Sequence, residues 1–153
     1  MLEINLGYTA PINRPGQPPL TIDQVWAGLT RKVTHAQEFV PVIVACEVLS
    51  DQHSPQKSGG NRTVSRRVTF RPGAGPMHSD TVREECVLHP PCRVDFCQED
   101  GTKIANYITS GEDGDLFMTY VFQWVLPEME EGSEETERLR ARYKEVSSTL
   151  LQG

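Results

Sequence analysis

The chain has 153 residues, of which 37% are hydrophobic, with 15 Lys and Arg against 21 Asp and Glu and a formal net charge of −6. A chain of this length buries roughly 68–70% of its unfolded surface, so we predict a single domain over residues 1–153. The acidic balance argues against nucleic acid and anionic membranes as partners, and the lack of a ~20-residue apolar run or a signal-peptide pattern predicts a cytoplasmic protein.

The first forty residues predict one strand and two short helices. Apolar residues at every second position indicate a strand over 1–8, and a proline-rich loop follows from Pro11. Thr21, with a glutamine three residues later, has the form of a capping box. Apolar residues at helical spacing then predict a helix over 22–34, and a second short helix is predicted over 36–39.

From residue 43 onward the apolar period changes to two, and turn residues interrupt the pattern at short intervals. The pattern predicts six further strands, at about 43–50, 62–70, 79–88, 92–98, 103–110 and 115–126. Asp100-Gly101 is the strongest hairpin signal among the turns. Strands in such close succession are typical of an antiparallel sheet.

A long helix is predicted at the C-terminal end, over 134–151, with Ser133 as its N-cap. A single apolar stripe on this helix would cover one face of the sheet. The predicted fold class is therefore α+β, with a seven-stranded curved antiparallel sheet wrapped around a long C-terminal helix and two short helices between the first two strands. This order is the helix-grip arrangement, and its curvature predicts a ligand cavity.

Several segments also resemble a known family. They are 20–29, 39–50, 68–70, 82–84 with 88–91, 111–114 and 131–135. These segments are similar to the AtaL-like family, a fungal branch of the START-like (SRPBCC) superfamily, and the similarity extends over nearly the whole chain. The resemblance implies that a hydrophobic small molecule binds in the grip cavity. It further implies a place beside fungal secondary-metabolite enzymes, since some superfamily members are cyclases, aromatases or condensing enzymes that need no cofactor.

The side chains expected on the inner face follow from the alternation of each strand. This inward set comprises Val44, Cys46, Val48, Val64, Arg66, Val68, Phe70, Val82, Glu84, Cys86, Leu88, Val94, Phe96, Ile104, Asn106, Ile108, Leu116, Met118, Tyr120, Phe122 and Trp124. The residues predicted to bind the substrate are Asn106, Tyr120, Trp124, Phe122, Met118, Cys86, Phe96 and, on the last helix, Tyr143.

Three members of this inward set are strongly polar: Arg66, Glu84 and Asn106. Burying an isolated charge is costly, so each needs a partner, a ligand or water. One interpretation is a structural ion pair between Arg66 and Glu84. A second makes Glu84 a catalytic acid or base, with Arg66 orienting a substrate oxygen and Asn106 holding the charge that develops on it. A slip in strand parity would instead turn Arg66 and Glu84 outward.

We therefore predict a cofactor-independent enzyme of the isomerase, cyclase or dehydratase type that acts on a hydrophobic natural-product intermediate. Motifs for nucleotide binding, serine hydrolases and zinc are absent from the sequence, so no cofactor or metal is expected, and the four cysteines are expected to be free. A non-catalytic carrier of the same ligand is the alternative. A regulatory module with a filled interior is a third possibility, and the ligand and oligomeric state stay open.

Overall fold

The computed structural model of the chain describes residues 2–53, 61–75 and 79–126, together with four helical residues: Glu134, Glu137, Arg138 and Ala141. The helix predicted over 134–151 lies outside the described residues apart from those four. Tyr143, predicted to contact the substrate, also lies outside them.

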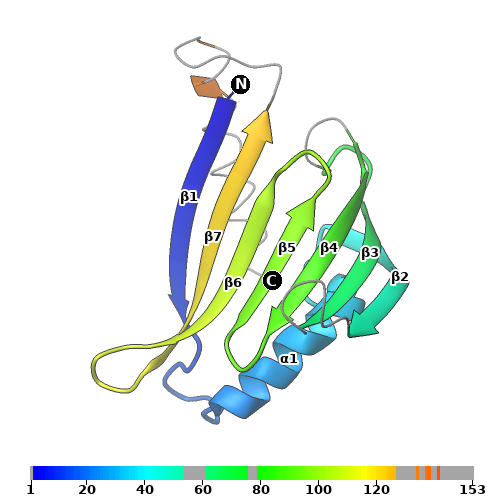
Figure 1. Ribbon diagram of the computed structural model, residues 1–153. Coiled ribbons are helices and arrows are strands. Elements are labelled where there is room, and N and C mark those ends of the chain that lie inside the picture. Colours follow the sequence, from blue (N-terminus) through cyan, green and yellow to red (C-terminus); the bar gives the residue numbers. More distant parts are fainter. Residues whose placement is uncertain are drawn as a thin grey trace.

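Seven strands form one antiparallel sheet in the order β1-β7-β6-β5-β4-β3-β2, so that β1 and β2 are the two edges (Figure 1). The strands are β1 (Leu2–Pro11), β2 (Ile43–His53), β3 (Arg62–Phe70), β4 (Thr81–His89), β5 (Arg93–Gln98), β6 (Lys103–Ser110) and β7 (Leu116–Leu126). The seven predicted strands are confirmed, with ends that differ by a few residues. Pro11 closes β1 opposite Phe117, because an edge strand tolerates a proline that cannot donate a hydrogen bond.

One α-helix and one short turn connect β1 to β2. The helix α1 (Ile22–Thr34) begins at the predicted capping box, in which Thr21 Oγ1 accepts from the Gln24 backbone and Gln24 Oε1 accepts from the Thr21 backbone. The second predicted helix is wrong in type, since η1 (Ala36–Glu38) is a single turn of 3-10 helix. No helix among the described residues is long and apolar enough to cross a membrane.

The largest hydrophobic cluster joins α1 to one face of the sheet. Val25, Leu29 and Val33 project from α1 at helical spacing and pack on inward residues of β3 to β6. The sheet contributes Val64, Cys86, Leu88, Val94, Phe96 and Ile108. A second cluster lies farther along the same sheet, between β1 and β7, and contains Leu2, Ile4, Phe122 and Trp124. The inward parity predicted for β3 to β7 therefore matches the observed packing.

The prediction for β2 is wrong at two positions. Val44 and Val48 were expected inside but are 54% and 42% exposed. The physical reason is that β2 is an edge strand whose pairing with β3 shifts register twice, between Ile43 and Ala45 and between Val48 and Ser50. Irregular pairing at an edge carries side chains away from the packed face even where they alternate correctly.

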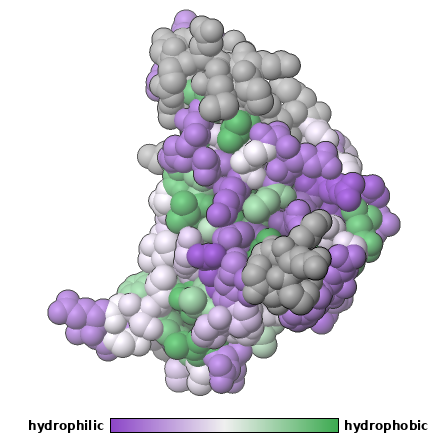
Figure 2. All heavy atoms as spheres, viewed as in Figure 1, coloured by the Kyte–Doolittle hydropathy of each residue, from purple (hydrophilic) through white to green (hydrophobic). Residues whose placement is uncertain are grey.

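The opposite face of the sheet is polar. Its residues on β4 and β5 include Asp95, a buried carboxylate that His89, Arg93 and Lys103 surround at 3.4 to 3.7 Å. Figure 2 shows hydrophilic residues over much of the face in view, with hydrophobic residues scattered between them. The apolar content of the sheet is thus concentrated on the side that packs against α1.

Candidate functional site

A cavity of about 350 Å³ lies between α1, the end of β1 and the inner face of β6 and β7. This volume falls within the range of roughly 300–1,000 Å³ that is usual for small-molecule sites. Most of its wall is apolar, with Val25 and Leu29 contributed by α1 and Met118 by β7. The polar groups on the wall are Arg14, Gln24, Lys32, Asn106 and Tyr120.

Asn106 is the most unusual of these polar groups. Its residue is 1% exposed, and neither Oδ1 nor Nδ2 has a hydrogen-bond partner within the described part of the chain. An unpaired buried amide costs about 1–3 kcal/mol, which is why native proteins rarely keep one. Asn106 is therefore a residue on the cavity wall whose hydrogen-bonding groups are left unused within the described part of the chain.

Tyr120 lies directly across from Asn106, because the two residues are partners in the register of β6 and β7. Both side chains therefore project from the same face of the sheet into the cavity. Burial raises the pKa of Tyr120, with a smaller contribution from the nearby phenol of Tyr8, so its hydroxyl stays protonated. Asn106 and Tyr120 together offer an N–H and an O–H donor side by side.

Lys32 reaches the cavity from the last turn of α1. Its Nζ lies 5.5 Å from the centre of the Tyr120 ring and 5.7 Å from that of Phe96. Burial lowers the pKa of Lys32 to about 8; Arg66 adds to this effect and Glu84 opposes it. The ammonium lines the cavity and has no hydrogen bond or ion pair with any described residue.

Arg66 and Glu84 form a buried ion pair, as in the first of the interpretations above. Arg66 Nη2 and Nε donate to Glu84 Oε1 at 2.8 and 3.2 Å, and Gln98 Nε2 donates to the other carboxylate oxygen at 3.4 Å. Both charged residues are nearly inaccessible, with exposed fractions of 4% and 6%. Neither residue lines the cavity. The structure therefore contains the ion pair, and the two residues that form it do not line the cavity.

The same arginine also fixes the end of α1. Its Nη1 donates to the backbone carbonyls of Lys32 and Val33 at 2.9 and 3.0 Å. Carbonyls in the last turn of a helix lack partners within the helix and carry partial negative charge, so a guanidinium stabilises them well. Arg66, held by Glu84, therefore determines where the backbone of Lys32 lies.

The other predicted contact residues divide into two groups. Met118 lines the cavity, as do Tyr120 and Asn106. Phe122 and Trp124 lie behind Tyr120 in a stacked row, with the Phe122 and Trp124 ring centres 4.9 Å apart, and are buried in the second cluster. Cys86 and Phe96 are also off the cavity wall, buried beneath α1, where burial raises the pKa of the Cys86 thiol. All four cysteines are free.

The sequence-based prediction named Asn106, Met118 and Tyr120 among the cavity residues but missed the residues of α1, of which Lys32 and Gly28 matter most here. Lys32 follows Val25 and Leu29 at positions i+7 and i+3, so it continues the buried stripe of the helix, but a charged residue was not considered as part of an apolar stripe. Gly28 occupies the same side of α1, and a side-chain carbon added there would meet no atom within 4 Å. The signal that identifies both is their shared helical face.

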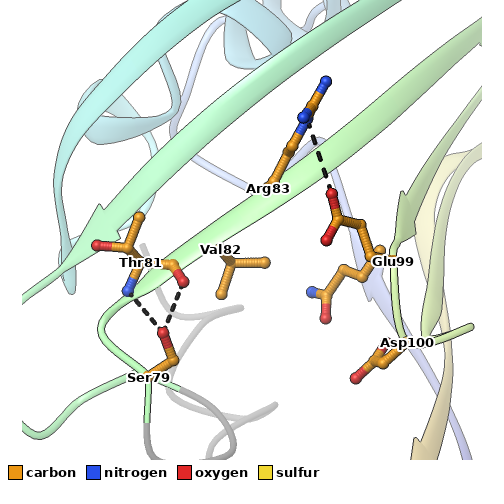
Figure 3. A pocket seen from close by; sticks show the side chains of 7 residues that line it. Ser79, Thr81, Val82, Arg83, Glu99 and Asp100 are labelled. Atoms are coloured by element: carbon orange, nitrogen blue, oxygen red, sulfur yellow. Dashed lines mark hydrogen bonds and ion pairs between the residues drawn. The ribbon is translucent and has the colours of Figure 1, made fainter.

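A second, smaller hollow of about 180 Å³ lies near the β4 and β5 ends (Figure 3). Its polar groups pair with one another: Arg83 Nε is 3.9 Å from Glu99 Oε1, and Ser79 Oγ bonds to the backbone of Thr81. Because these groups already satisfy each other at the surface, the cavity beside α1 is the better candidate site.

The sequence of the chain matches a known protein family. Residues 6–153 match the AtaL family, described as Acetylaranotin biosynthesis cluster protein L. The protein of that name from Aspergillus terreus is 26% identical over 144 residues, which cover 94% of this chain and 79% of the relative.

Solved structures with low identity share the fold. The aromatase/cyclase ZhuI from a Streptomyces species superposes with a TM-score of 0.68 at 13% identity, covering 97% of this chain and 88% of its own. A START superfamily protein from Mycobacterium smegmatis gives 0.56 at 8% identity, covering 99% and 94%. Norcoclaurine synthase from Thalictrum flavum gives 0.54 at 15% identity, covering 99% and 96%. The chain therefore belongs to the AtaL family and has the START-like fold that its sequence resemblance predicted.

Proposed function

We propose that the protein is a cofactor-independent enzyme of fungal secondary metabolism that binds a hydrophobic intermediate in the cavity beside α1 and promotes its isomerisation, ring closure or dehydration. The orphaned amide of Asn106 on the cavity wall is the observation that carries the proposal. The similarity to a biosynthesis-cluster protein and to aromatase/cyclases supports it. In this proposal, residues 1–153 form one domain that acts in the cytoplasm.

Isomerisations, aldol-type ring closures and dehydrations of carbonyl compounds share an enol or enolate stage. Asn106 Nδ2 and the Tyr120 hydroxyl are placed to donate to the oxygen on which negative charge grows. Lys32 lines the cavity beside Tyr120, and as an ammonium with a pKa of about 8 it is the group placed to donate a proton to that oxygen. The apolar wall around Met118 and Leu29 excludes water and shapes the bound chain.

In this proposal Arg66 and Glu84 are positioning residues. Glu84 holds Arg66, and Arg66 holds the carbonyl of Lys32, so the pair fixes the lysine against the cavity. The sequence-based hypothesis that Glu84 itself transfers the proton remains a separate prediction. It requires substrate access to a carboxylate that is 6% exposed and off the cavity wall.

The test uses beta-tetralone, an apolar bicyclic ketone with an acidic C–H bond, as a surrogate substrate. Proton exchange in D₂O, followed by NMR, should be faster with the protein than in buffer. Lys32→Met should abolish the acceleration and Asn106→Leu should reduce it by roughly tenfold or more, as removal of an oxyanion donor does. Lys103→Met, on the opposite face, is the matched control and should behave as wild type.

Two other outcomes would change the assignment. If Glu84→Gln abolishes exchange while the protein stays folded and Lys32→Met keeps the acceleration, the proton transfer belongs to Glu84. If beta-tetralone binds but its exchange is never accelerated, the enzyme proposal is overturned. The carrier alternative would then stand, and the lack of any carboxylate among the described cavity residues favours it.

A further inference from the structure

We propose that the ligand of the cavity is an apolar organic anion, whose oxyanion lies against Lys32 and Asn106 while its apolar body fills the space beside Gly28. This inference rests on the proposed function, because it assigns a chemical class to the molecule that the cavity holds. Three independent features of the described residues support it: the sign of the charges on the wall, the unmatched ammonium, and the unused amide donor.

The charged residues on the cavity wall are cationic, although the chain as a whole is acidic. Asp and Glu outnumber Lys and Arg by 21 to 15 overall. The described residues that line the cavity nevertheless include two cations, Arg14 and Lys32, and no carboxylate. A low-dielectric cavity lined by charges of one sign concentrates the field inside it. The field in this cavity favours an anion.

Lys32 lacks a counterion of its own among the residues that the structure describes. The groups that face it from the neighbouring elements are Arg66, Glu84, Cys86 and Tyr120. Cys86 is a buried thiol and Tyr120 a protonated phenol, so neither supplies a negative charge. Glu84 does carry one, but it is paired with Arg66 at 2.8 Å. The half-buried ammonium lies over the rings of Phe96 and Tyr120 without a carboxylate of its own among the described residues, and a ligand oxyanion would stabilise its charge.

Asn106 adds direction to this attraction. Its unpaired Nδ2 donor is on the same wall as Lys32, and a hydrogen bond to a charged acceptor is roughly twice as strong as one between neutral groups. Arg14 is exposed at the cavity, where it can steer an approaching anion but cannot hold it strongly. We therefore expect Lys32 to contribute more to affinity than Arg14.

Two fluorescent probes with the same ring skeleton test the inference. Anilinonaphthalene sulfonate carries one negative charge, and its parent N-phenylnaphthylamine carries none. The anion should bind wild type about tenfold more tightly than the neutral probe, corresponding to about 1.4 kcal/mol. Lys32→Met should remove most of that preference and leave the neutral probe unaffected. Arg14→Gln should lower the affinity for the anion by only about two- to threefold.

The pH dependence of wild type gives the same test without a mutation. As pH rises through about 8, Lys32 loses its charge, so affinity for the anionic probe should fall while affinity for the neutral probe stays constant. Lys103→Met should retain wild-type affinities for both probes. Gly28→Phe should exclude both probes, because its ring would occupy the open space on the cavity side of α1.

The failures are distinguishable. Equal affinity of wild type for the two probes, unchanged by Lys32→Met and by pH, would overturn the anion assignment and leave a hydrophobic cavity intact. Failure of both probes to bind a folded protein would overturn the proposed function as well. Binding that survives in Gly28→Phe would place the probes elsewhere and overturn the assignment of this cavity as the anion site.

Discussion

Two sets of polar side chains on the inner face of the sheet differ in how completely they are satisfied. Arg66 and Glu84 use their hydrogen-bonding groups on each other, on Gln98 and on the end of α1. Asn106, on β6, is as buried as Arg66 and Glu84. Neither the oxygen nor the nitrogen of its side-chain amide has a hydrogen-bond partner among the described residues. Lys32, on α1, likewise has no counterion of its own within the described ranges.

We interpret the difference as one between a structural role for the pair and the binding role proposed for Asn106 and Lys32. A satisfied buried pair holds elements in place, and nothing further is needed to explain it. Burial of an unsatisfied group costs free energy, and a ligand that hydrogen-bonds to the group would offset that cost. Sheet position alone cannot make this distinction, because Arg66, Glu84 and Asn106 all lie on the same face.

The largest expected effect concerns the satisfied pair. Glu84→Leu leaves the Arg66 guanidinium buried without its carboxylate, so the free energy of unfolding should fall by about 3–5 kcal/mol. Urea denaturation measures the change. Glu85→Leu, at the next position and exposed, should change stability by less than about 0.5 kcal/mol. An equal effect of the two substitutions would remove the structural role of the pair.

Asn106→Leu should have the opposite sign. Replacing the unpaired amide with an apolar side chain of similar size removes its desolvation penalty, so stability should rise by about 1–2 kcal/mol. The same variant should bind anilinonaphthalene sulfonate less tightly. Thermal unfolding of wild type, Asn106→Leu and the exposed control Asn5→Leu provides the comparison, and destabilisation by Asn106→Leu would show that the amide is already satisfied.

Lys32 should make stability depend on pH in a defined window. Its pKa in the folded chain is about 8, against a usual value of 10.5, so between these values the unfolded chain binds more protons. Stability should therefore rise as pH increases from about 8 toward 10.5, by an amount on the order of 1 kcal/mol after allowing for water in the cavity. In Lys32→Met this rise should be missing, and a rise identical to that of wild type would contradict the assignment.

The smallest expected effect is at Gly28. Alanine there meets no atom within 4 Å and has higher helix propensity, so Gly28→Ala should stabilise the protein by about 0.5–1 kcal/mol without affecting probe binding. Loss of stability in a urea titration would mean that the space beside α1 is filled. Together with Gly28→Phe, this variant separates the helix propensity of the position from the room it leaves.

The sequence was sufficient for the sheet and for α1, because alternation and capping are local signals. The register of β3 and β4 even placed Arg66 opposite Glu84. The sequence could not show that Arg66 also donates hydrogen bonds to the carbonyls of Lys32 and Val33, because that contact depends on how α1 packs on the sheet. Lys32 was missed for the same reason, since its role depends on the helix face being turned toward β6 and β7.

NMR of side-chain amides tests the central claim most directly. The Asn106 NH₂ signals, assigned by their loss in Asn106→Leu, should shift as anilinonaphthalene sulfonate is added, while the Gln98 NH₂ signals beside Glu84 should stay in place. A titration that moves the Gln98 signals and leaves those of Asn106 unchanged would contradict the account, because the ligand would then lie at the ion pair and the orphaned amide would have no part in binding.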